Sequence, residues 1–119
     1  MKFARWVFLI AGIYGLLVTA PLYFTEAQFA EQFPPPLTHP EYYYGFLGVT
    51  LAWQVMFLII ARDPVRYRTV MLVGVLEKAA YGIAALVLFA LGRVTGFTLA
   101  FGLIDLTLGV LFYVGYRRT

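Results

Sequence analysis

Residues 74–87 read GVLEKAAYGIAALV, an apolar run with a glutamate and a lysine, Glu77 and Lys78, near its centre. The run continues without a further charge from Val70 to Leu91. At about 1.5 Å per residue, this length is sufficient to cross the ~30 Å hydrocarbon core of a membrane. A charge inside a membrane is costly and nearly always faces other helices. The segment therefore predicts a membrane helix that carries a polar site.

The composition of the whole chain predicts the same class of protein. Of its 119 residues, 62% are hydrophobic and 13% are charged, a balance that a soluble domain of this length cannot bury. Helices are expected at about residues 3–24, 43–61, 64–91 and 94–116, with an outer loop at 25–42. These runs are apolar all round, unlike the alternating strands of a membrane β-barrel. We predict one all-α membrane domain over residues 1–119, a four-transmembrane-helix antiparallel bundle.

The first run has a second interpretation, as a secretory signal peptide. Lys2 and Arg5 precede it, and Thr19-Ala20 resembles a cleavage region. However, the run is longer than the apolar region of a signal peptide, and Pro21 follows the expected cleavage site. We therefore expect a retained helix.

The cations predict the orientation of the bundle. The N-terminus, the turn at 62–68 and the C-terminus share seven of the nine lysines and arginines, and the opposite side receives only Arg93. Cytoplasmic segments carry the excess of positive charge, so both termini are expected in the cytoplasm. The side with seven holds Lys2, Arg5, Arg62, Arg66, Arg68, Arg117 and Arg118. Three of them, Arg62, Arg66 and Arg68, could bind lipid headgroups or simply fix the topology.

The two connections around the second helix differ in length. In the turn at 62–68, Asp63 is a good N-cap and Pro64 a good first helical residue, so residues 43–61 and 64–91 should form an antiparallel hairpin. In the outer loop at 25–42, Thr25 could cap a short interfacial helix that ends before Phe33. The loop is either a lid packed on the bundle or a docking surface for a partner.

Few polar residues fall inside the predicted spans. They are Tyr14, Gln54, Glu77, Lys78, Tyr81, Asp105 and Thr107. Counting from a turn at residues 92–95 places Asp105 level with residue 82, within reach of Lys78, and Tyr81 could donate its hydroxyl to Asp105. Glu77 and Lys78 point about 100° apart, so we do not expect them to be partners. Glu77 must then find a donor such as Gln54 or Tyr14, or keep its proton.

Small residues accompany these polar positions at helical spacing. Gly102 and Gly109 share a face with Asp105, and Gly74 and Gly82 share a face with Lys78. Gly12 and Gly15 flank Tyr14 in the first span. This spacing predicts close approach of the helices on their polar faces.

Several chemistries find no support in the sequence. The chain has no cysteine and no serine, and its one histidine, His39, lies in the outer loop. We therefore expect no metal, no cofactor, no catalytic residue and no nucleic-acid partner.

The plan of the chain resembles the DoxX-like and BphX-like group of small bacterial four-helix membrane proteins. The resemblance covers a longer outer loop after the first helix, the RDPVRYR turn at 62–68 and the LEK segment at 76–78. It implies a bacterial cytoplasmic membrane. The small multidrug resistance transporters have a similar length, but their membrane glutamate lies in the first helix, which has no acid here.

Three functions are consistent with these features. The first is a non-enzymatic protein that binds a hydrophobic small molecule, a lipid or a partner membrane subunit through the polar cluster of Glu77, Lys78, Asp105, Tyr81, Gln54 and Tyr14. The second is a proton-coupled transporter or channel subunit that uses Glu77. The third is an intramembrane isomerase that uses Glu77 and Asp105. The same cluster could also only hold the helices together, in a monomer, a homo-oligomer or a larger membrane complex.

Overall fold

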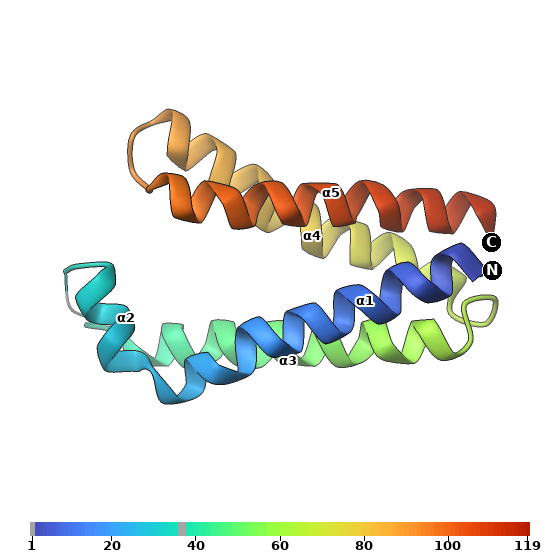
Figure 1. The fold of residues 1–119 in the computed structure, drawn as a ribbon, viewed down its shortest axis with the longest axis horizontal. Helices are drawn as coiled ribbons and strands as arrows, with labels where there is room; N and C mark the ends of the chain where they lie inside the picture. Colours follow the sequence, from blue (N-terminus) through green and yellow to red (C-terminus); the bar gives the residue numbers. More distant parts are fainter. Residues whose placement is uncertain (1, 36–37) are drawn as a thin grey trace.

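The computed structural model describes residues 2–35 and 38–119. Its elements in chain order are α1 (Lys2–Thr19), the 3-10 helix η1 (Ala20–Phe24), α2 (Glu26–Gln32), α3 (Pro40–Arg62), α4 (Arg68–Ala90) and α5 (Gly96–Arg118). Figure 1 shows α1, α3, α4 and α5 running along the long axis of the molecule, with both termini at one end.

Four helical segments are long and apolar enough to span a membrane. The first runs from α1 through η1 to Phe24, and it and the three that follow are each 23 residues long. A helix of this length rises about 35 Å, enough for a ~30 Å hydrocarbon core. The chain reverses its direction from each span to the next (Figure 1). The predicted all-α fold with four antiparallel membrane-spanning helices is confirmed.

The bundle consists of two helix pairs. α4 packs along α5 and α1 packs along α3, whereas α3 and α4 touch each other only sparsely. Contacts between α1 and α5 join the two pairs. The expected hairpin of residues 43–61 and 64–91 is therefore antiparallel in direction, but its two helices pack mainly against other partners. This loose contact between α3 and α4 leaves the groove described below.

An aromatic cluster joins the two pairs near the termini. Phe8 of α1, Phe57 of α3 and Phe112 of α5 are fully buried. Phe8 stacks on Phe112 with ring centroids 4.0 Å apart, and Phe57 lies edge-on to Phe112 at 4.9 Å. Ala4, Ala11, Ile60, Ala61 and Met71 complete this core. The buried aromatic core thus lies toward the end of the bundle that carries both termini.

Glycines bring α4 and α5 together as their spacing predicts. Gly82 lies against Leu106 and the carbonyl of Gly102, and Gly109 lies beside the Cβ of Lys78. The contacts of Gly82 also agree with the predicted register, which places Asp105 level with residue 82. The absence of a Cβ atom at these glycines lets the other helix approach closely, so α4 and α5 pack tightly beside their polar residues.

The turns at the two ends of α4 have different origins. At the first, the backbone N–H of Arg66 donates to Oδ1 of Asp63 at 3.3 Å, and Pro64 is fully buried. Residues 64–67 form a hydrogen-bonded turn, so α4 begins at Arg68 and not near Pro64 as expected. At the second, Gly92 adopts the left-handed conformation (φ 72°) that ends many helices.

The segment between α1 and α3, residues 20–39, contacts the start of α3. The hydroxyl of Tyr43 donates to the carbonyl of Leu22 at 2.6 Å, and the ring of Phe29 in α2 lies 5.2 Å from that of Tyr43. The short helix predicted before Phe33 is present as α2, but the hydroxyl of Thr25 donates to Pro21 instead of capping it. Of the two alternatives for this segment, these contacts agree with a lid packed on the bundle.

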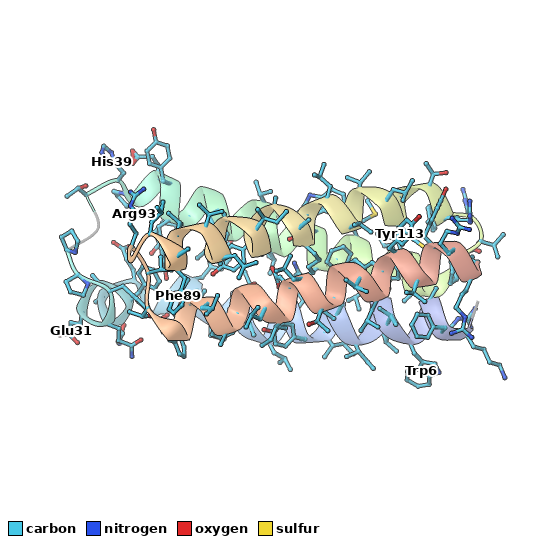
Figure 2. All side chains as sticks on the ribbon, turned by 90° about the horizontal axis from the view of Figure 1, so that it is seen from above. Trp6, Glu31, His39, Phe89, Arg93 and Tyr113 are labelled. Carbon is cyan, nitrogen blue, oxygen red and sulfur yellow. The ribbon has the colours of Figure 1, made fainter. Side chains whose placement is uncertain are left out.

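Large apolar side chains cover the outside of the bundle. Trp6 is 61% exposed, Leu17 72% and Leu76 65%. Figure 2 shows Trp6 projecting from the side of the bundle, while Glu31, His39 and Arg93 lie at the end opposite the termini. An apolar surface this extensive is typical of a protein surrounded by lipid.

Candidate functional site

Three charged side chains meet inside the α4–α5 pair, and we call them the charge triad: Glu77, Lys78 and Asp105. The side chain of Lys78 is 4% exposed, and its Nζ lies 3.7 Å from Oε2 of Glu77 and 3.6 Å from Oδ1 of Asp105. All three residues are close to the middle of their 23-residue helices. The triad thus places two carboxyl groups and one ammonium group near the middle of two helices that are long and apolar enough to span a membrane.

The structure contains the predicted pair of Lys78 and Asp105. The prediction that Glu77 and Lys78 are not partners is wrong, because Lys78 Nζ is about equally distant from both carboxyl groups. The two side chains do leave the helix in different directions, but the flexible four-carbon stem of a lysine can bring its ammonium group back toward a neighbour. Gly109 leaves room on α5 for this stem.

The ammonium group of Lys78 also contacts an aromatic ring. Its Nζ lies 5.2 Å from the ring centroid of Phe57, within the range of a cation–π interaction. Since Phe57 belongs to α3, the charge triad is linked to the aromatic core of the bundle. Lys78 is therefore held by groups from α3, α4 and α5.

Glu77 keeps one oxygen atom without a hydrogen bond. Its Oε2 is buried and accepts no hydrogen bond from the described residues. The separation of 3.7 Å from Lys78 Nζ is too long for a hydrogen bond. Neither expected donor, Gln54 or Tyr14, is hydrogen-bonded to Glu77 in the described part of the chain, so the other expectation, that Glu77 keeps its proton, stays a prediction.

The interior tyrosines belong to different helices, Tyr14 to α1 and Tyr81 to α4. Within residues 2–35 and 38–119, the hydrogen bond predicted from Tyr81 to Asp105 does not form. Tyr81 shares α4 with Glu77 and Lys78, and it lines the same groove as Glu77.

Gln54 lies apart from the charge triad, between α1 and α3. Its side chain is buried, and it packs so closely on Gly15 that a Cβ atom there would overlap its amide group. Nε2 donates to the carbonyl of Thr50 on the same helix at 2.9 Å, and Oε1 has no hydrogen-bond partner in the described chain. The contact with Gly15 fits Gln54 to the α1–α3 interface.

A groove of about 300 Å³ lies between α3 and α4, and Glu77 forms part of its wall. Most of the lining is apolar or aromatic, and several wall residues are well exposed, such as Val49 at 64% and Leu76 at 65%. The groove is thus accessible from the side of the bundle. Its walls are Phe46, Val49, Thr50 and Trp53 of α3 and Val73, Leu76, Glu77, Ala80 and Tyr81 of α4.

A second hollow, of about 290 Å³, lies on the α4–α5 pair. It is lined by Val75, Ala79, Leu106, Gly109, Val110 and Tyr113 and includes no charged side chain. The α3–α4 groove therefore combines apolar walls with a carboxyl group, and this second hollow does not.

The three arginines near the first turn have different surroundings. Arg62 and Arg66 are exposed, whereas Nε of Arg68 donates to the carbonyl of Tyr116 at 3.1 Å and its guanidinium group lies 3.9 Å from that ring. Arg68 therefore joins the start of α4 to the end of α5. Of the three predicted headgroup contacts, Arg62 and Arg66 have the side chains that reach solvent or lipid most freely.

The described residues offer no ready metal site. In residues 2–35 and 38–119, His, Cys, Asp and Glu side chains do not gather in groups of three or more that could hold a metal ion.

Sequence reasoning identified the acids and the lysine but missed the walls of the groove. Trp53, Phe46 and Thr50 belong to these walls, yet α3 is apolar on every face, so its periodicity does not show which face is left open. The one available signal is the pairing of small residues. Small residues face each other between α4 and α5, where Gly102 lies against Ala85, whereas Gly15 of α1 lies against the large Gln54 of α3.

Comparison of the chain with known protein families, with curated proteins and with solved structures found no match.

Proposed function

We propose that this protein binds a hydrophobic small molecule in the α3–α4 groove and is not an enzyme. The observation that carries the proposal is the wall of the groove, in which Glu77 and Tyr81 stand among apolar and aromatic side chains. Small-molecule sites combine apolar walls with a few polar groups that orient the ligand. Here a carboxyl acceptor and a phenol donor lie side by side on α4.

The size and position of the groove favour a small molecule over a protein helix. A volume of about 300 Å³ is at the lower end for ligand pockets, and a helix with its side chains is about 10 Å wide. Because exposed residues such as Leu76 and Val49 form its edges, a ligand dissolved in the membrane can enter from the side. Membrane lipid is then both the surroundings of the protein and the route to the site.

The alternative functions stay predictions. A proton-coupled transporter that uses Glu77 requires a polar path to one face of the membrane, and the walls of the α3–α4 groove are mostly apolar. An isomerase requires Glu77 and Asp105 to face the same substrate. Glu77 lines the groove and Asp105 does not, which favours binding without catalysis.

We also propose that both termini face the cytoplasm of a bacterium, as in the DoxX-like and BphX-like group. Support comes from the turn between α3 and α4, which lies at the same end as the termini (Figure 1). Seven of the nine lysines and arginines occupy this end, and Arg93 lies at the other end with Glu31 and His39 (Figure 2). An excess of cations on one side marks the cytoplasmic face.

Single cysteines test this orientation, because the chain has none of its own. We expect a membrane-impermeant maleimide to label Glu31→Cys in intact cells and to label Thr119→Cys only after the cells are opened. The reverse pattern would overturn the proposed orientation and leave the fold unaffected.

Tryptophan fluorescence tests the proposed binding, because Trp53 lines the groove and Trp6, the other tryptophan, faces outward. Trp6→Phe leaves Trp53 as the only fluorophore, and Trp53→Phe leaves Trp6. Both proteins, in phosphatidylcholine vesicles, are titrated with three bromophenylbutyl probes that end in a hydroxyl, a trimethylammonium or a sulfonate group. Bromine quenches a nearby indole, so we expect saturable quenching of Trp53 by at least one probe and only linear, partition-driven quenching of Trp6.

A matched pair of alanines controls for non-specific quenching. Ala80 lines the groove and Ala100 is exposed on α5 outside it. In the protein without Trp6, Ala80→Phe should abolish the saturable component, and Ala100→Phe should leave it unchanged. If all three probes quench Trp53 linearly and Ala80→Phe has no effect, the groove is not a binding site.

A further inference from the structure

We propose that the α3–α4 groove selects a lipophilic monovalent cation, meaning an amine or quaternary ammonium group carried on an apolar body. This inference rests on the proposed binding function of the groove and adds the chemical class of its ligand.

The charge triad has one negative charge without a partner. Glu77 and Asp105 share the single ammonium group of Lys78, whose Nζ lies at 3.7 and 3.6 Å from them. When all three groups are ionised, the triad carries a net charge of minus one. The other eight lysines and arginines lie in the first or last turns of the long helices or in the turns between them, so none stands near the middle of the bundle. A proton on Glu77 or a cationic ligand in the groove can neutralise this charge, and the two compete for the same carboxylate.

Glu77 is the acid that reaches the groove, with a side chain that is 19% exposed, and its Oε2 is turned toward Lys78. Of the two acids, only Glu77 belongs to the lining of the α3–α4 groove. Its Oε2 is buried and accepts no hydrogen bond from the described residues. Removing an ion from water is costly unless it is paired, so a cation placed beside Glu77 would relieve a cost that the protein alone leaves in place. An anion would add to that cost.

The remaining walls suit a cation as well. Phe46, Trp53 and Tyr81 offer aromatic rings, whose faces attract ammonium groups. The protein uses the same interaction for its own cation, since Lys78 Nζ lies 5.2 Å from the ring centroid of Phe57. The lining provides no lysine or arginine that would bind an anion or repel a cation. Shape and charge of the groove therefore agree on one class of ligand.

Two probes of equal shape separate charge from hydrophobicity. One is bromophenylbutyl-trimethylammonium, and the other replaces the trimethylammonium group with an uncharged tert-butyl group. Each is titrated into the Trp6→Phe protein in phosphatidylcholine vesicles, which carry no net surface charge. Quenching of Trp6 in the Trp53→Phe protein measures how much of each probe enters the membrane, so affinities are compared at equal membrane concentration.

We expect the cation to bind about tenfold more tightly than its uncharged analogue, a difference of about 1.4 kcal/mol. Glu77→Gln keeps the size of the side chain and removes its charge, so it should reduce this preference to less than about twofold while the uncharged probe still binds. Glu31→Gln is the matched control, since it removes one carboxylate from the exposed outer segment, and it should leave the tenfold preference intact.

The outcomes distinguish this inference from the proposed function. Saturable binding of both probes with equal affinity overturns the cation preference and leaves the groove a general hydrophobic site. Linear quenching by both probes overturns the cation preference and the binding function together. Saturable binding that favours the cation supports both, and it requires no substitution in the triad that could disturb folding.

Discussion

Gln54 and the charge triad are both polar sites within the bundle, but their surroundings differ. Gln54 is 1% exposed, and its side chain fills the space beside Gly15 between α1 and α3. The triad joins α4 to α5, and its member Glu77 forms part of an accessible wall. Each site also keeps one buried oxygen atom without a hydrogen bond in the described chain, Oε1 in Gln54 and Oε2 in Glu77. Both sites therefore contain an unsatisfied atom. They differ in whether a ligand can reach the side chain, which lines a groove in Glu77 and is enclosed in Gln54.

This comparison indicates which interior polar residue is a candidate for function. A neutral amide sealed between two helices can hold them in one arrangement, but no ligand can reach it. A carboxyl group on the wall of a groove can bind a ligand that enters the groove. Substitutions at the two sites should therefore affect different measurements.

The largest effect is expected at Lys78. Lys78→Met removes the only cation of the triad and leaves Glu77 and Asp105 buried near each other. Breaking a buried ion pair by removing one partner costs about 3–5 kcal/mol, so we expect the free energy of unfolding to fall by an amount of this order. Unfolding by sodium dodecyl sulfate in mixed micelles measures the change.

A double variant shows whether the cost comes from charge. Lys78→Met with Asp105→Asn returns the triad to a net charge of minus one, so it should regain a substantial part of the lost stability. If the double variant is less stable than Lys78→Met alone, packing of the lysine stem, and not charge, would explain the loss.

An intermediate effect is expected at Gly15. A Cβ atom at this position would overlap the amide group of Gln54, and Gln54 is enclosed on all sides. Overpacking of this kind costs about 1–3 kcal/mol, so Gly15→Ala should destabilise the protein by that amount in the same unfolding measurement.

Two variants check this explanation. Gly45→Ala adds the same methyl group to α3 where no atom lies within 4 Å, so it should not destabilise the protein. Adding Gln54→Ala to Gly15→Ala removes the amide group that would overlap the new methyl group, so the double variant should recover stability. A loss in Gly45→Ala equal to that in Gly15→Ala would contradict the close fit of α1 and α3.

The smallest effect is expected at Gln54 itself. Gln54→Leu removes a hydrogen bond within α3 and a buried carbonyl oxygen without a partner, two changes of opposite sign. The free energy of unfolding should change by less than about 1 kcal/mol, since one hydrogen bond has a net value of about this size and the two changes offset each other. A loss of several kcal/mol would show that Gln54 holds a partner that its surroundings do not reveal.

Much of the fold follows from the sequence for physical reasons. Long apolar runs predict the four spans, and the short turn around Gly92 sets the register that brings Asp105 within reach of Lys78. Glycines at three- and four-residue spacing predict the tight α4–α5 contact. These features depend on neighbours along the chain or on one hairpin, and such information is local.

The features that the sequence does not predict depend on which face of each helix packs against which neighbour. α3 is apolar all round, so its sequence does not show that it packs on α1 and stays loosely joined to α4. The α3–α4 groove is a consequence of that choice. The contact between Glu77 and Lys78 was missed for another reason, because the direction of a Cβ atom does not determine where a long side chain ends.

The most direct test of the account compares Glu77→Gln with Gln54→Leu in the protein whose only tryptophan is Trp53. The measurement is the ratio of affinities for bromophenylbutyl-trimethylammonium and its uncharged tert-butyl analogue, obtained from saturable quenching. We predict that Glu77→Gln loses the preference for the cation and that Gln54→Leu retains it. Equal behaviour of the two variants, whether both lose the preference or both keep it, would contradict the claim that Glu77 is a ligand-binding residue and Gln54 a packing residue.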